Sequence, residues 1–124
     1  MLGDTFPEKA AAGSLRRMLF DDPGRFGLTS VSIASNCSHL SAGPFEAMFE
    51  LSNFFGEPGS TNITAERTRM WELMTEAKIS PGCKRAALDN PIITIAGNDR
   101  SLFDLTEEVD AKSSAYAYRI LNSE

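Results

Sequence analysis

The side chains most able to do chemistry in this sequence are Cys37 and His39, which are separated by a single residue. In an extended strand this spacing would place both side chains on the same face. A thiol next to an imidazole is the pair that cysteine nucleophiles use. A minor enzymatic activity at Cys37 or His39 therefore stays open. The simpler interpretation, which we favour, is a loop histidine in solvent beside a thiol with no catalytic role.

The remaining sequence carries no recognisable catalytic or metal-binding motif. His39 is the only histidine, and this excludes zinc sites that need two imidazoles, including the HExxH motif. Cys37 and Cys83 lie far apart in the sequence and form no CxxC pair. The phosphate loop GxxxxGK[ST] and the dinucleotide motif GxGxxG are absent. We therefore expect no metal and no cofactor, and we favour a protein that is not an enzyme.

The charge balance argues against nucleic acid as a partner. The 124 residues include 12 Lys and Arg and 17 Asp and Glu, for a formal net charge of -5. Domains that bind DNA or RNA usually present a basic face, because neutralised phosphates supply much of their affinity. Here the densest basic stretch, residues 67–85, is interleaved with Glu72 and Glu76. An acidic surface of this kind would match a basic protein partner instead.

Chain length and the distribution of apolar residues predict one cytoplasmic domain. A chain of 124 residues is of the usual size for a single domain, so we expect one globular domain over residues 1–124. No run of 18 apolar residues could cross a membrane, and the first residues lack the apolar stretch of a signal peptide. We expect both cysteines to be reduced, because a domain of this size needs no disulfide to fold.

The periodicity of apolar residues predicts an α+β fold in which helices predominate, with about four helices and two or three short strands. We expect helices over residues 8–20, 44–55 and 64–78 and from 101 to about 120, with a short further turn of helix at 81–88. Residues 28–34 and 92–96 are rich in β-branched side chains, which predicts strands. Pro and Gly predict a turn at 57–60.

The predicted helix over residues 44–55 is the most unusual element, because it is apolar over most of its circumference. Such a helix needs cover on several sides. It is either the central core helix, or it lies partly in the core and partly against a partner. Aromatic and Met side chains are enriched at the centres of protein interfaces. The residues that we select for partner contact are Phe45, Met48, Phe49, Phe55 and Trp71.

Within this helix we expect a division of roles. Residues 45, 48, 49 and 52 share one face at helical spacing, whereas Phe54 points well away from Phe49. We therefore expect Phe49 to lie in the core and at least one of Phe45, Phe54 and Phe55 to lie at an interface.

Two segments resemble parts of the glucose-6-phosphate isomerase family. Residues 14–26, SLRRMLFDDPGRF, are similar to the N-terminal segment of these enzymes. Gly56-Glu57-Pro58, together with Asn62, Thr64, Glu66 and Arg67, is similar to a later motif of the family. The two segments cover less than a third of the chain, with different spacing. None of the family's catalytic residues can be placed on this sequence, so the resemblance implies no activity for the chain.

Taken together, these features predict a protein-binding protein without enzymatic activity. The profile is typical of small acidic subunits, adaptors and inhibitors from phages, viruses and bacterial conflict systems. The partner would be another protein or a second copy of the chain, bound through the aromatic and Met side chains of the helix. The alternative is a small-molecule-binding protein or minor enzyme with a pocket lined by the same aromatic residues, in which His39 or Cys37 does the chemistry.

Overall fold

The computed structural model of the chain describes residues 1–56 and 62–122. The chain divides into two compact units, Met1–Leu40 (unit 1) and Ser41–Glu124 (unit 2). The turn predicted at 57–60 lies outside the described residues.

Unit 1 is built from short helical segments. The α-helix α1 (Leu15–Asp21) lies between the 3-10 helices η1 (Pro7–Lys9) and η2 (Pro23–Phe26). The helix predicted over residues 8–20 thus begins only at Leu15. The reason is local: Gly13 adopts a positive φ of 79°, and the Ser14 side chain caps the helix by accepting a hydrogen bond from the Arg17 amide at 3.4 Å.

A buried arginine holds distant parts of unit 1 together. The Nε atom of Arg16 donates to the Ser38 hydroxyl at 3.0 Å, and its Nη1 atom donates to the Gly3 carbonyl at 3.0 Å. The strand predicted at 28–34 is wrong, since this stretch contains only one isolated bridge, between Ser32 and Ser35. β-Branched residues favour a strand only where a neighbouring strand or core face receives them, and the bridge lies within a tight local turn.

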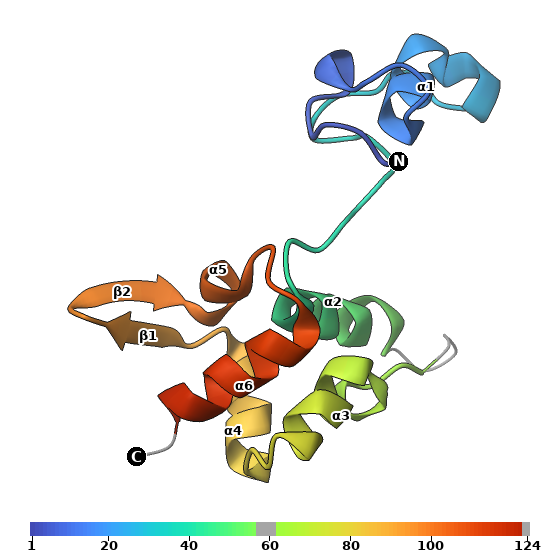
Figure 1. Cartoon of the computed structure of the whole chain (residues 1–124). Coiled ribbons are helices and arrows are strands. Elements are labelled where there is room, and N and C mark those ends of the chain that lie inside the picture. Colours follow the sequence, from blue (N-terminus) through green and yellow to red (C-terminus); the bar gives the residue numbers. More distant parts are fainter. Residues whose placement is uncertain (57–61, 123–124) are drawn as a thin grey trace. The chain divides into compact units, whose positions relative to one another are not determined.

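Unit 2 contains the remaining helices and a hairpin (Figure 1). Its elements are α2 (Pro44–Phe55), η3 (Ala65–Arg67), α3 (Arg69–Glu76), α4 (Pro81–Ala86), η4 (Ala87–Asp89), β1 (Ile92–Ile95), β2 (Asn98–Ser101), α5 (Leu102–Thr106) and α6 (Ala111–Leu121). The described residues of the whole chain form six α-helices and one two-stranded sheet. The predicted α+β class with predominant helices is therefore confirmed, with more and shorter helices than expected.

The core of unit 2 lies where α2, α3 and α6 meet (Figure 1). Phe45 of α2 is fully buried and meets the Tyr118 ring of α6 edge-on, with ring centroids 5.1 Å apart. Met70, Leu73 and Met74 lie at i, i+3 and i+4 and supply the buried face of α3. Burying these apolar side chains is the main contribution to the stability of unit 2.

Capping residues decide where two helices begin and end. The helix predicted over 64–78 starts at Arg69, because the Thr68 hydroxyl, and not that of Thr64, accepts the hydrogen bond from the Trp71 amide. The helix predicted from 101 to about 120 divides into α5 and α6. Glu108 takes a positive φ of 57° between them, and Asp110 caps α6.

The strand predicted at 92–96 is present as β1, and it pairs with a second strand, β2, that the sequence pattern did not reveal. Ile95 pairs with Asn98, which leaves a two-residue loop of Ala96 and Gly97. Both loop residues have positive φ, 51° and 81°, as in a type I′ turn. The hairpin extends away from the helices of unit 2 (Figure 1).

Candidate protein-binding surface

The helix α2 forms because its ends carry clear signals. Pro44 occupies the first turn, Gly43 is the N-cap, and Gly56 ends the helix. Gly43 is also required for packing, since a Cβ atom there would lie 2.7 Å from the Thr106 carbonyl oxygen. The helix is therefore held closely against the end of α5 at its N-terminus.

One aromatic and one Met side chain of α2 are buried, and four other large apolar side chains of the helix are partly exposed. Phe45 and Met48 are buried in the core of unit 2. By contrast, Phe49, Leu51, Phe54 and Phe55 expose 38%, 39%, 59% and 44% of their surface. Scattered apolar side chains are normal on a protein surface, but four large ones on one short helix make α2 a candidate binding element.

An apolar groove runs beside this exposed side of α2. It has a volume of about 200 Å³, and its walls come from α2, from the start of α3 and from the first residue of α6. The lining residues are Pro44, Ala47, Met48, Leu51, Thr68, Arg69, Met70 and Ala111. We call this feature the α2 groove. It is smaller than the roughly 300–1,000 Å³ typical of small-molecule pockets, and it suits the insertion of a partner side chain.

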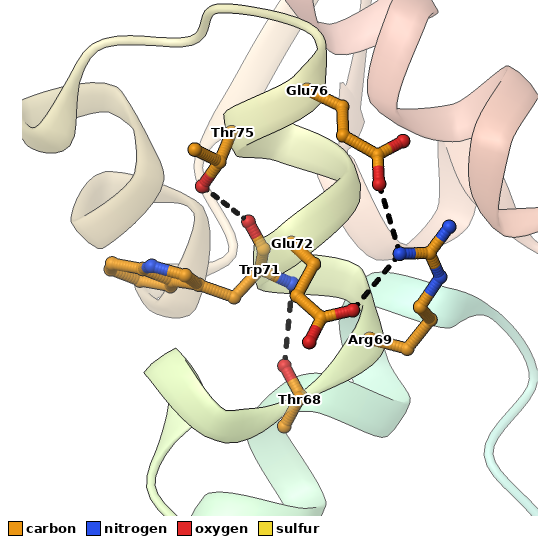
Figure 2. Close-up of polar contacts among 6 residues, drawn as sticks. All are labelled: Thr68, Arg69, Trp71, Glu72, Thr75 and Glu76. Carbon is orange, nitrogen blue, oxygen red and sulfur yellow. Dashed lines mark hydrogen bonds and ion pairs between the residues drawn. The ribbon is translucent and has the colours of Figure 1, made fainter.

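Arg69, which lines the α2 groove, is held by two carboxylates. Its Nη1 atom lies 2.9 Å from Glu72 Oε2 and 3.0 Å from Glu76 Oε1 (Figure 2). Hydrogen bonds from the guanidinium to Glu72 and Glu76 raise the pKa of Arg69 above its ordinary value. Arg69 and its two carboxylate partners together carry one excess negative charge.

Two carboxylates of α2 hold the segment that comes just before the helix. Glu46 Oε2 accepts a hydrogen bond from the Ala42 amide at 2.7 Å, and Glu50 Oε2 accepts one from the Ser41 hydroxyl at 2.5 Å. The Glu108 amide donates to the Ala42 carbonyl at 3.0 Å, which brings the acidic link between α5 and α6 to the same place. Pro44, two residues along the chain from Ala42, lines the groove.

Trp71 lies on the other flank of α3. Its side chain points away from the ion pairs of Arg69 with Glu72 and Glu76 (Figure 2). The Lys84 ammonium lies 4.8 Å from the centroid of the Trp71 ring and donates to the Thr75 hydroxyl at 2.9 Å. This cation–π contact packs α4 against α3, so Trp71 has a structural role away from the α2 groove.

The five residues selected from the sequence for partner contact therefore divide into three groups, of which Trp71, packed against Lys84, is one. Phe45 is buried, and Met48 is buried with part of its side chain on the groove wall. Phe49 and Phe55 are exposed on α2, and the Phe49 ring also contacts Phe103 of α5 at 5.9 Å between centroids. We expected Phe49 in the core and at least one of Phe45, Phe54 and Phe55 at an interface. In the structure Phe49 is partly exposed and Phe45 is buried, whereas Phe54 and Phe55 are exposed.

Other residues of the surface were not among the five selected from the sequence. Leu51 was not selected at all, and Phe54 was named only as one of three candidates for an interface. The outward position of both follows from the position of the buried face. The sequence does not mark Ala47 and Ala111 as groove residues. A small apolar residue lines a groove only when packing places another element across from it. Only the packing of α6 against α2 brings these two residues to the same hollow.

Cys37 and His39, the pair considered for catalysis, lie in unit 1, and both are exposed. Cys37 and Cys83 are not linked to each other. Within the described ranges, no three His, Cys, Asp or Glu side chains gather as the ligands of a metal ion would. The same ranges contain no helix long and apolar enough to cross a bilayer.

Comparisons of the chain with models of protein families, with curated proteins and with solved structures find no match.

Proposed function

We propose that this chain is a protein-binding protein and that it contacts its partner through the exposed side of α2. The observation that carries the proposal is the exposure of four large apolar side chains on one 12-residue helix, beside an apolar groove. Interfaces of this type concentrate their binding energy in a few apolar and aromatic anchors that enter pockets. Removing Phe54 and Leu51 from water is one source of that energy.

The proposal concerns binding and not catalysis. The α2 groove has an apolar lining apart from Thr68 and Arg69, and the guanidinium of Arg69 is already paired. Cys37 and His39 belong to unit 1 and line none of these walls. An acidic subunit, adaptor or inhibitor would use such a surface to recognise one protein.

The proposal is tested by comparing what the intact chain and two variants capture from native lysate. The double change Leu51→Ser and Phe54→Ser removes two exposed apolar anchors from α2. The matched control is Ile120→Ser, because Ile120 is an exposed aliphatic residue on α6. We expect a captured protein that is lost with the α2 variant and retained with the control, while all three chains keep similar melting temperatures.

Light scattering on the same samples measures self-association. A dimer that dissociates only in the α2 variant would make the partner a second copy of the chain. Capture that is identical for all three chains, with no change of mass, would overturn the proposal.

A further inference from the structure

The hairpin of unit 2 has two outer edges, and the register of its strands shows which main-chain groups face outward. In a hairpin with a two-residue loop, the pair that flanks the loop is hydrogen-bonded, and the bonded pairs then recur at every second position. In line with this alternation, the Leu102 amide donates to the Pro91 carbonyl at 2.9 Å. The amides and carbonyls of Ile92 and Thr94 fall at the positions between, so they point away from β2.

The outer edge of β1 is left open by the rest of unit 2. Among the described elements of this unit, β1 packs extensively with β2 alone. No hydrogen bond within the described residues reaches the outward amides and carbonyls of Ile92 and Thr94. The Ile92 side chain exposes 67% of its surface. A row of unpaired backbone groups of this kind is a template for pairing with another strand.

The outer edge of β2 differs, because its side chains protect it. Asp99 and Arg100 lie in this strand, and charged side chains are one of the devices that keep edge strands from pairing. Arg100 also donates to the Asp104 carbonyl at 2.8 Å, and the Ser101 hydroxyl accepts from the Asp104 amide, which ties β2 to α5. By contrast, β1 contains no charged residue, no proline and no glycine. Of the two edges, that of β1 is the one open to a further strand.

We propose that the outer edge of β1 pairs with the same edge of a second copy of the chain, so that two hairpins form one four-stranded antiparallel sheet. This inference goes beyond the proposed function, because it uses a different surface and does not depend on α2. An antiparallel pairing centred on Ile93 places Ile92 of each copy opposite Thr94 of the other. Every outward amide and carbonyl of the two strands then gains a hydrogen-bond partner.

This self-complementarity identifies the second copy as the occupant. The cross-strand pairs of Ile92 with Thr94 join β-branched side chains, which suit a pleated surface. Because the hairpin extends away from the helices of unit 2 (Figure 1), the antiparallel direction places the two sets of helices at opposite ends of the sheet.

The net charge of -5 on each chain does not act at this seam, because β1 is uncharged. In the four-stranded sheet the two β2 strands are outermost, three strand spacings or about 14 Å apart. This separation exceeds the Debye length of about 8 Å at physiological salt, so repulsion between the β2 strands is largely screened.

The experiment measures the mass of the full-length chain by light scattering between about 10 µM and about 1 mM. A dissociation constant near 100 µM makes both the monomer and the dimer visible in this range. We expect the mass to rise from that of one chain toward that of two as the concentration increases.

Two proline variants then locate the seam. Thr94→Pro removes an outward amide of β1 and no hydrogen bond of the hairpin backbone. Its matched control is Asp99→Pro, the opposite member of the same pair, at the outer edge of β2. Both variants lose the same side-chain hydrogen bond, from the Thr94 hydroxyl to the Asp99 carboxylate. We expect Thr94→Pro to weaken the dimer about tenfold or more and Asp99→Pro to leave it within about twofold of the intact chain.

Amide hydrogen exchange of the intact chain gives a readout that needs no variant. The amides of Ile92 and Thr94 should exchange about threefold or more slowly at the highest concentration than at the lowest, because the dimer protects them. The Asp99 amide, which faces outward on β2, should keep its rate.

The possible results separate this inference from the proposed function. A chain that keeps the mass of a monomer throughout would overturn the inference. So would a dimer that responds equally to both proline variants, or exchange at Ile92 and Thr94 that does not change with concentration. A dimer that only the Leu51 and Phe54 double variant dissociates would overturn the hairpin as the seam and support α2. The capture experiment with that double variant decides the proposed function independently.

Discussion

At the scale of single residues, the phenylalanines of α2 differ in their environment although they share one helix. Phe45 is surrounded by the core of unit 2 and contacts the Tyr118 ring. Phe54 exposes more than half of its surface. The same residue type thus lies in the core at one position and is largely exposed at another.

This difference predicts unequal costs for the same substitution. Phe45→Ala should lower the free energy of unfolding by about 3–5 kcal/mol, because it removes buried surface and leaves a cavity. Phe54→Ala, in the same helix, should change it by no more than about 0.5 kcal/mol. Urea unfolding followed by Trp71 fluorescence measures both values. Equal losses for the two variants would show that the outer side of α2 is packed in solution.

The charge of a single residue, Asp110, contributes to the stability of α6. Hydrogen bonds from Ser113, through its hydroxyl and its amide, lower the pKa of Asp110 below the ordinary value in the folded chain. A carboxyl group whose pKa is lower when folded stabilises the fold above its unfolded pKa of about 4. This stabilisation is lost as the pH falls through the folded value.

The substitution Asp110→Asn tests this dependence, because Asn also caps helices and does not titrate. We expect the melting temperature of each chain to fall between pH 7 and pH 3, and that of the intact chain to fall further than that of Asp110→Asn. Asp99→Asn serves as a control at an exposed hairpin carboxylate. If both chains lose the same amount, the cap does not depend on the charge of Asp110.

At the scale of elements, side-chain caps mark where four helices of unit 2 begin, and a short loop joins its two strands. Thr68, Ser80, Ser101 and Asp110 each cap a helix through a side-chain oxygen. The two-residue loop of the hairpin is a different case, since Ala96 has a positive φ without the advantage of glycine or asparagine. The turn is therefore strained at that one position.

A residue that tolerates positive φ better than alanine should stabilise the hairpin turn at position 96. Ala96→Asn would create Asn-Gly, the pair most favoured in type I′ turns. We expect it to raise the free energy of unfolding by up to about 1 kcal/mol, the order of the penalty for a non-glycine residue in this region. Ala96→Val is the opposite control, because a β-branched side chain fits this conformation worst. Thermal unfolding of the three chains should rank them Asn, Ala, Val.

At the scale of the whole molecule, the two units differ in charge and in core. Unit 1 contains four Lys and Arg and four Asp and Glu. The buried cluster that runs from Phe45 to Tyr118 lies within unit 2. Unit 2 therefore contains its own core as well as the α2 groove, whereas unit 1 is tied together by polar contacts such as those of Arg16.

We predict that a fragment covering residues 41–124 folds without unit 1. Its melting temperature should lie within about 5 °C of the full chain, which for a domain of this size corresponds to about 1 kcal/mol. Trp71 fluorescence and circular dichroism measure the transition, with the full chain as the reference. A fragment without a cooperative transition would support the single domain over residues 1–124 that the chain length predicts.

The sequence by itself determined the fold class and the bounds of α2, because these depend on local signals. Pro44 and Gly56 act on the backbone next to them, and apolar spacing is a property of neighbours along the chain. The sequence pattern did not predict β2, because its residues Asn98–Ser101 are polar and form a strand only by pairing with β1. The sequence pattern also predicted one continuous helix where the structure has α5 and α6. The division depends on the backbone conformation of Glu108 and on the cap at Asp110.

Only the tertiary structure decided which residues of α2 are buried and which are exposed. The helix is apolar nearly all round, so its sequence gives no direction, and the core face is set by the positions of α3 and α6. For this reason Phe45 and Met48 are buried, whereas Leu51 and Phe54 lie outside. The α2 groove is likewise a product of three segments that are distant in sequence, because small residues such as Ala47 and Ala111 form a wall only once packing places them side by side.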